Sequence, residues 1–164
     1  MSDLKTAIMK AERGVYLLVA DKSDDFTTAL RYAQRLSLQS QAHIGLAYII
    51  EKQDFLHWGN IEDRMREEQR KEAEQYLFDV AGDVNAITGT QPVFYILEGD
   101  KTDALTELIN EDMTIKMLVL GGDSQGGAPG PLVSFFSGKG LGQLRVPLTV
   151  VPNHLTESDI DSIF

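Results

Sequence analysis

The sequence predicts an α/β protein built on a five-stranded, parallel, doubly wound sheet. Short apolar runs alternate with longer helical stretches along the 164 residues, which is typical of βαβ units. The middle runs are almost continuously apolar, as expected of strands that are buried on both faces. The five expected strands cover 15–20, 43–50, 92–97, 116–120 and 148–151.

Four helices are expected in the crossovers between these strands. Asp24 and Asp25 suit the start of the first helix, since their side chains can accept hydrogen bonds from the first free amides. Gly82 is expected to stop the second helix, and the glycines after Pro131 favour a short or bent fourth one. The expected helices cover 24–39, 61–80, about 102–110 and a segment after Pro131.

Composition excludes several classes of protein. No apolar run approaches the roughly 18 residues that a membrane helix needs, and charges occupy the start of the chain where a signal peptide is apolar. The absence of cysteine excludes disulfides, thiol chemistry and zinc fingers. The net charge of -10 argues against a nucleic-acid partner. We therefore expect a cytoplasmic protein with one domain over 1–164, its core at about 15–152 and a polar tail at 153–164 that lies on the surface or frays.

The expected topology indicates where a ligand would bind. Right-handed crossovers favour a flavodoxin-like or closely related strand order, in which ligands bind where the winding direction reverses. Here that point lies between the carboxyl ends of the first and fourth strands. The loops at that point are 21–23 and the glycine-rich segment 121–130.

Glycine-rich loops can either turn repeatedly or point backbone amides at an anion, and the position of this loop favours a phosphate cradle. Two well-known phosphate motifs are absent. Gly138-Lys139 lacks the first glycine of a P-loop and is followed by Gly140 instead of Ser or Thr. The dinucleotide fingerprint also fails, because Gln143 stands where its third glycine is required.

Three stretches of the sequence resemble the universal stress protein family. The first expected strand ends in Asp21-Lys22-Ser23, the second ends in Tyr48-Ile49-Ile50, and the last reads Val-Pro-Leu-Thr-Val-Val-Pro over 146–152. The three stretches occur in the family's order and spacing, and the resemblance covers nearly the whole chain. The resemblance implies a fold like that of the adenine nucleotide alpha hydrolases, a homodimer formed through the last strand, and a stress-response role in which many members bind ATP.

The resemblance also implies a site. Asp21 would meet the ribose or base, Ile49 would frame adenine, and the loop after the fourth strand would hold the phosphates. In the family, the phosphate motif is Gly-x-x-Gly followed by nine residues and then by Gly-Ser or Gly-Thr. Of its three glycines only Gly121 is present here, because Ser124 and Ser134 replace the other two, and Phe135 replaces the final Ser or Thr. The residues expected to bind a ligand are Ala20, Asp21, Lys22, Ser23, Tyr48, Ile49, Leu120, Gly121, Gly122, Gly127, Gly130 and Ser134.

Alternatives remain at several positions. Asp21 could instead cap the first helix, or hold a metal ion with Asp123. His57 and Trp58 could form a lid on a nucleotide base, or Trp58 could pack over the sheet edge.

The expected function is that of a dimeric stress-response protein that binds ATP with magnesium, or another small anionic ligand. A non-nucleotide interaction or regulatory module is the alternative, and a slow nucleotidase is a third possibility. No catalytic residue and no protein metal site is expected, since the sequence has neither a nucleophile elbow nor a cysteine.

Overall fold

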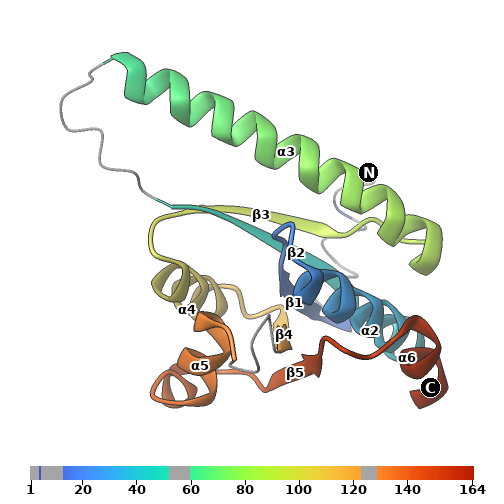
Figure 1. Cartoon of the computed structure of the whole chain (residues 1–164). Helices are drawn as coiled ribbons and strands as arrows, with labels where there is room; N and C mark the ends of the chain where they lie inside the picture. The colour runs from blue at the N-terminus through green and yellow to red at the C-terminus, as the bar shows by residue number, and fades with distance from the viewer. Residues whose placement is uncertain (1–3, 5–12, 52–59, 123–128) are drawn as a thin grey trace.

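A computed structural model describes residues 4, 13–51, 60–122 and 129–164, and Figure 1 shows the arrangement of its elements. The elements are β1 (Val15–Val19), α2 (Asp24–Ser40), β2 (His43–Ile50), α3 (Asn60–Thr88), β3 (Val93–Glu98), α4 (Lys101–Glu111), β4 (Ile115–Gly122), α5 (Pro131–Ser137), a 3-10 turn η1 (Leu141–Gln143), β5 (Leu148–Pro152) and α6 (Glu157–Ile163). No helix among the described residues is long and apolar enough to cross a membrane.

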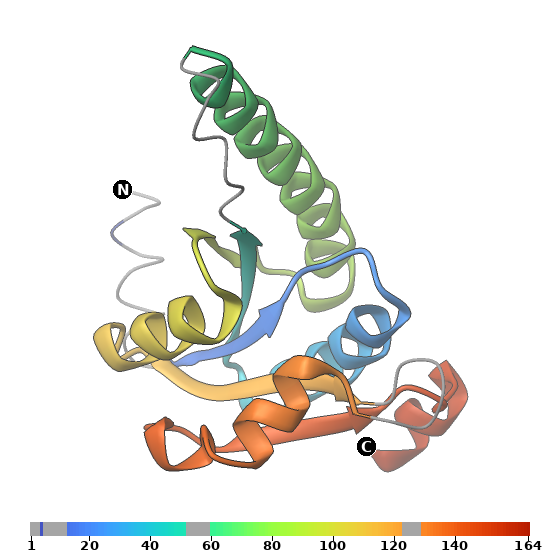
Figure 2. The same ribbon diagram turned by 60° about the vertical axis from the view of Figure 1, so that its left-hand side comes forward.

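The five strands form one parallel sheet in the order β3-β2-β1-β4-β5, which confirms the predicted fold class. Helices α2 and α3 cover one face, and α4 and α5 cover the other (Figure 2). β1 lies at the centre, and the winding direction reverses between β1 and β4. The carboxyl ends of these two strands therefore form the switch point at which open α/β sheets bind ligands.

Helix α2 begins at Asp24, as predicted, but its N-cap is the residue before the expected capping pair. Ser23 is the N-cap residue, and its hydroxyl accepts a hydrogen bond from the amide of Phe26 at 3.2 Å. Asp24 and Asp25 instead lie in the first turn, where their charges favour the positive end of the helix dipole. The helix ends at Gln41, whose left-handed backbone (φ 63°) closes the last turn.

Helix α3 continues through Gly82 to Thr88, so the prediction that Gly82 stops it was wrong. A glycine inside a helix costs only about 1 kcal/mol relative to alanine, and burial outweighs this cost. Val80 and Ala81 before the glycine and Val84 after it are all buried, and Val80 and Val84 belong to the cluster that α2 and α3 form with the sheet. The helix ends instead at Gly89, where φ is positive.

Strand β4 includes Gly121 and Gly122, which were expected to begin the ligand-binding loop. Both pair with β5, Gly121 opposite Val151 and Gly122 opposite Pro152. A Cβ on Gly121 would lie 2.5 Å from the carbonyl carbon and 2.8 Å from the Cα of Asp25. Gly121 is therefore required because the first turn of α2 packs directly on the end of β4.

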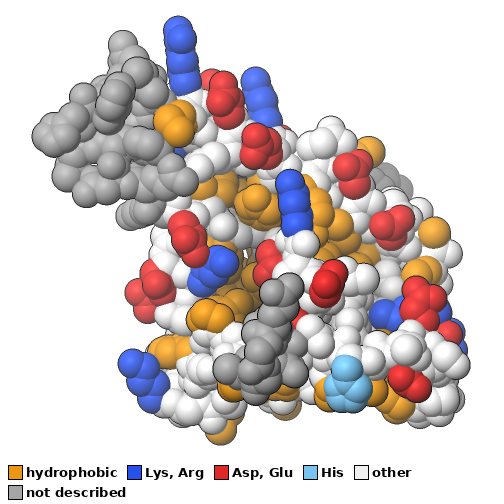
Figure 3. All heavy atoms as spheres, in the orientation of Figure 1, with side chains coloured by type: hydrophobic (Ala, Val, Ile, Leu, Met, Phe, Trp, Pro, Cys, Tyr) orange, Lys and Arg blue, Asp and Glu red, His pale blue; other side chains and the backbone are white. Residues whose placement is uncertain are grey.

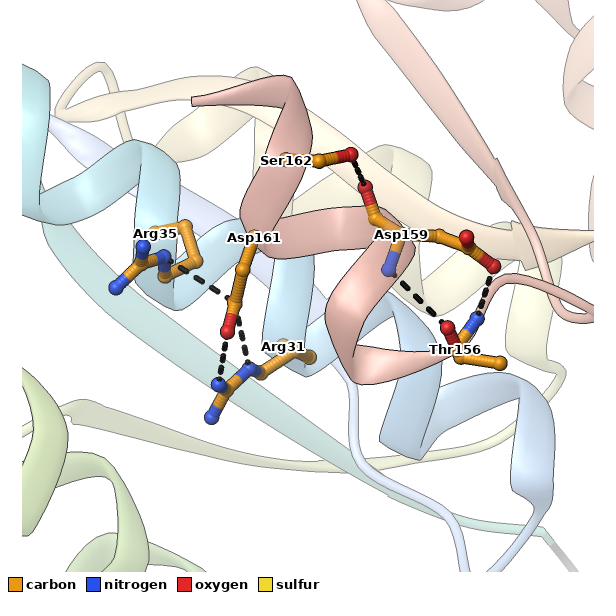
Figure 4. Close-up of polar contacts among 6 residues, drawn as sticks. All are labelled: Arg31, Arg35, Thr156, Asp159, Asp161 and Ser162. Atoms are coloured by element: carbon orange, nitrogen blue, oxygen red, sulfur yellow. Dashed lines mark hydrogen bonds and ion pairs between the residues drawn. The ribbon is translucent and has the colours of Figure 1, made fainter.

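The chain after β5 forms helix α6, which packs on α2 (Figure 4). A capping box starts the helix: the Thr156 hydroxyl accepts from the amide of Asp159, and the Asp159 carboxylate accepts from the amide of Thr156. Ile160 is buried, and Asp161 accepts hydrogen bonds from both Nε and Nη2 of Arg31. The predicted polar tail thus lies on the surface as a docked helix.

The docking of α6 on α2 is expected to weaken at acidic pH. The hydrogen bonds from Arg31 and the charges of Arg31 and Arg35 lower the pKa of Asp161 below its usual 3.8, so the contribution of this ion pair to docking is fully present above that value and is lost as the pH falls through the lowered pKa. Asp161→Asn is expected to loosen α6 already at neutral pH, as seen in the NMR shifts of residues 157–164. The exposed Asp83→Asn on α3 is the control, and equal behaviour of the two variants would contradict this role of Asp161.

Candidate ligand-binding site

A cavity of about 310 Å³ opens at the switch point, between the carboxyl ends of β1 and β4. This volume is at the lower end of the range of small-molecule sites. Its wall is built by the starts of α2, α4 and α5 and by Glu51 after β2. Figure 3 shows a hollow on this face of the molecule, with apolar side chains in its depth and acidic and basic side chains at its rim.

The floor of the cavity is apolar. It is formed by side chains from the sheet and from the inner faces of α2 and α5, most of which are buried in the two hydrophobic clusters. These residues are Leu18, Val19, Phe26, Ala29, Val119, Leu120, Leu132 and Val133. An apolar floor with a polar rim suits a flat, partly apolar ligand whose polar groups point outward.

The turn between β1 and α2 supplies the first polar group. The Asp21 carboxylate accepts hydrogen bonds from the amide of Ser23 at 3.0 Å and from the Ser23 hydroxyl. Ser23 in turn caps α2, so Asp21 orients the capping residue and does not cap the helix itself. Both side chains line the cavity.

Tyr76 of α3 also holds the turn between β1 and α2. Its hydroxyl donates to the backbone carbonyl of Asp21, and its ring packs edge-on against Tyr48 and Phe26. Burial, followed by the nearby charge of Asp21, raises the pKa of Tyr76 to about 12, so the hydroxyl stays protonated and keeps donating. This contact fixes the backbone of the turn.

The start of α4 supplies the opposite wall. Asp100 is the N-cap residue and accepts from the Thr102 hydroxyl at 2.6 Å and the Asp103 amide at 3.1 Å. These hydrogen bonds, led by that of Thr102, lower the pKa of Asp100, so its carboxylate remains charged. The ammonium of Lys101 lies 3.5 Å from the carboxylate of Glu51.

The rim of the cavity is strongly acidic. Its ionisable side chains are Asp21, Asp25, Glu51, Asp100 and Lys101, so four carboxylates oppose one ammonium group among the described residues. No group of three or more potential metal ligands occurs in the described part of the chain. The proposed metal pair of Asp21 and Asp123 includes a residue outside the described ranges.

About half of the predicted site residues lie together at this cavity. Asp21, Ser23, Leu120, Gly121 and Gly130 line it, whereas Ala20, Lys22, Tyr48, Ile49, Gly122 and Ser134 are placed elsewhere, and Gly127 lies outside the described residues. His57 and Trp58 also lie outside them.

The residues placed elsewhere have structural contacts of their own. Ala20 donates its amide to Ala47, Tyr48 packs on Tyr76, and Ile49 belongs to the cluster under α4 and α5. The Lys22 ammonium lies 5.6 Å above the ring of Tyr76. A Cβ on Gly122 would meet Val150, and the Ser134 hydroxyl donates to Pro129 at 3.4 Å.

Helix α5 is short, as predicted, and ends at Gly138. Phe135, which stands where the family pattern has a hydroxyl, packs against Phe136 and over Gly140, where a Cβ would overlap its ring. The helix is thus anchored by aromatic packing beside the cavity.

Sequence reasoning missed the wall made by Glu51, Asp100, Lys101 and Thr102. None of these residues was among the predicted ligand-binding residues, and the third helix was expected to begin only at about Thr102. Because all strands are parallel, the segments after β2 and β3 lie at the same edge of the sheet as those after β1 and β4. The Asp-x-Thr pattern of a helix start and the opposite charges of Glu51 and Lys101 were the signals that could have located this wall.

The fold and the cavity together define an open α/β domain with a crevice at the switch point of its sheet. The model of the Universal stress protein family matches residues 16–152, and the chain belongs to this family.

Solved structures of universal stress proteins share the fold at low sequence identity. The UspA protein of Lactobacillus plantarum has a TM-score of 0.70 and 13% identity, over 85% of this chain and 97% of that one. A universal stress protein in complex with cAMP has a TM-score of 0.61 and 18% identity, over 86% and 98%. A family member from Burkholderia pseudomallei has a TM-score of 0.57 and 17% identity, over 85% and 96%. A search of curated proteins gives no significant match.

Proposed function

We propose that this universal stress protein binds an adenine nucleotide or another small anionic ligand in the cavity between β1 and β4, and serves the stress response of the cytoplasm. The observation that carries the proposal is the cavity itself, an apolar hollow with a polar rim at the switch point of the sheet. A family member of the same fold has been solved with cAMP.

The cavity suits the nucleoside part of such a ligand. Its floor offers apolar surface for a base, and its rim offers the Ser23 and Thr102 hydroxyls and the Asp21 carboxylate for ribose hydroxyls. The turn that carries Asp21 is held by Tyr76 and Ser23, so these groups are fixed before a ligand arrives.

The residues present fit a magnesium triphosphate less well than they fit a nucleoside. Gly121 serves helix packing, and the described rim has an excess of carboxylates with no three-ligand metal cluster. ATP with magnesium therefore remains one candidate ligand among adenine compounds. The acidic rim is also the observation that favours the second candidate, an interaction module that binds no nucleotide.

Thermal unfolding with adenine compounds tests the proposal. Millimolar adenosine, cyclic AMP, AMP and ATP are each added, with and without magnesium, and at least one is expected to raise the melting temperature, because binding to the folded state stabilises it. Gly130→Leu, which adds a side chain at the cavity edge where a Cβ meets no atom within 4 Å, is expected to abolish the shift. Gly142→Leu in η1, also in open space, is the matched control. If no compound stabilises the protein, the interaction module is favoured.

We also propose a homodimer formed through β5. This strand is an edge of the sheet, and Val150 on it is 39% exposed. Unpaired edge strands with apolar side chains are commonly covered by a partner. Sedimentation equilibrium is expected to give a dimer that Val150→Lys converts to monomer; a monomeric wild type would contradict the proposal.

A further inference from the structure

We propose that the cavity selects adenine ligands of low charge, with no more than one negative charge, and that Glu51 and Asp100 are the residues that exclude polyphosphates. This inference rests on the proposed function and specifies its ligand class. It is carried by the distribution of charges around the cavity and by the contacts that hold those charges in place.

The only basic group among the described residues of the rim already has an acidic partner. The Lys101 ammonium lies 3.5 Å from Glu51, so a phosphate that approached Lys101 would also approach this carboxylate. Lys22 does not line the cavity, and its ammonium lies over the ring of Tyr76. A polyphosphate entering the cavity would therefore meet no uncompensated cation among the described lining residues.

The acidic groups are fixed as acceptors. Asp100 accepts hydrogen bonds from the Thr102 hydroxyl and the Asp103 amide, and these bonds favour its charged form. Asp21 accepts hydrogen bonds from the amide and the hydroxyl of Ser23. Asp25 accepts from the Asn153 amide group at 2.6 Å. Three of the four rim carboxylates are thus engaged as hydrogen-bond acceptors, and none can donate a hydrogen bond to a phosphate oxygen while ionised.

Coulomb repulsion scales with the product of the charges, so these carboxylates disfavour a triphosphate several times more strongly than a monoanion. Two of the glycines expected to approach the phosphates, Gly121 and Gly122, lie in β4 beside β5 and therefore do not form a phosphate loop that could offset this repulsion. A nucleoside, or a nucleotide whose phosphate carries one charge, avoids most of it and still uses the apolar floor and the hydroxyl groups.

Calorimetric titration of the full chain with adenosine, cyclic AMP and magnesium-free ATP tests the inference. Wild type is expected to bind cyclic AMP or adenosine more tightly than ATP. The double variant Glu51→Gln with Asp100→Asn keeps the shapes and the helix-capping oxygen, and is expected to tighten ATP binding about tenfold while changing adenosine binding by less than about twofold. The control variant Asp83→Asn with Glu111→Gln removes the same two charges from exposed positions on α3 and α4, and is expected to leave both affinities near wild type.

The salt dependence of ATP binding gives a second readout, and its expected direction is opposite to that at a cationic phosphate site. Raising the salt from about 50 mM to about 500 mM screens the repulsion, so the affinity of wild type for ATP is expected to rise, whereas it falls at a cationic phosphate site. Tighter binding of ATP than of cyclic AMP by wild type, or an equal effect of the two double variants, would overturn the inference but leave the proposed function standing. Failure of every adenine compound to bind wild type and the neutralised variant would remove both.

Discussion

Gly121→Ala is expected to destabilise the protein by about 3 kcal/mol or more, because overpacking against backbone is costly. The new Cβ would lie 2.5 Å from the carbonyl carbon of Asp25 and closer still to its oxygen. Backbone cannot rotate away as a side chain can, and this turn of α2 is held by the Ser23 cap and by Asn153, which binds the Asp25 carboxylate. The start of α2 would therefore have to move away from β4, which would also deform the cavity.

Urea unfolding of Gly121→Ala and Gly82→Ala measures this effect against a matched control. A Cβ on Gly82 meets nothing within 4 Å and lies within helix α3, so Gly82→Ala is expected to raise the free energy of unfolding by about 0.5–1 kcal/mol. The two identical substitutions thus have opposite expected signs. A mild effect of Gly121→Ala would show that the glycine is not required for packing and would reopen a phosphate role for it.

Phe136→Ala is expected to lower the free energy of unfolding by about 3–5 kcal/mol, which is typical of removing a fully buried phenylalanine. Phe136 has an exposed fraction of 0% and lies in the cluster formed by α4, α5 and the sheet. It anchors α5, a helix of seven residues that has no side-chain cap. Because α5 forms part of the cavity wall, the variant is also expected to weaken ligand binding.

Phe78→Ala is the matched control for this substitution. The Phe78 side chain on α3 is 71% exposed, so its removal is expected to change the free energy of unfolding by less than about 0.5 kcal/mol. Equal losses in the two variants would contradict the account of how α5 is held.

The fold could be predicted because its signals are local and repeated. Strands such as His43–Ile50 are apolar without interruption, and helix α2 has an apolar stripe that ends near its observed end. Each crossover of a parallel sheet is right-handed, so the order of the elements limits the possible topologies. The chain therefore places its switch point between β1 and β4 as expected.

The wrong boundaries have tertiary causes. The propensity of Gly82 favours a break, but contacts of Val84 with the sheet, which local sequence does not reveal, carry α3 onward. Gly121 was interpreted as the first residue of a phosphate-binding loop because a glycine-rich segment follows it. Its actual requirement is the nearby backbone of Asp25, which is 96 positions away in the sequence and is brought close only by the fold.

The site was predictable in its location more than in its chemistry. The position of the turn with Asp21 and Ser23 follows from the topology. The acidic wall of Glu51 and Asp100 depends instead on how the start of α4 meets the end of β2. The net charge of -10 indicated an acidic surface without showing that part of it surrounds the cavity.

The cavity between β1 and β4 is proposed to bind an adenine compound of low charge. NMR titration of the full chain with cyclic AMP tests it most directly, because backbone amide shifts report where the ligand contacts the protein. Saturable shifts are expected, concentrated at Ser23, Phe26, Lys101, Thr102 and Leu120. Shifts concentrated elsewhere, such as around His43 at the opposite ends of the strands, or no saturable shift, would contradict it.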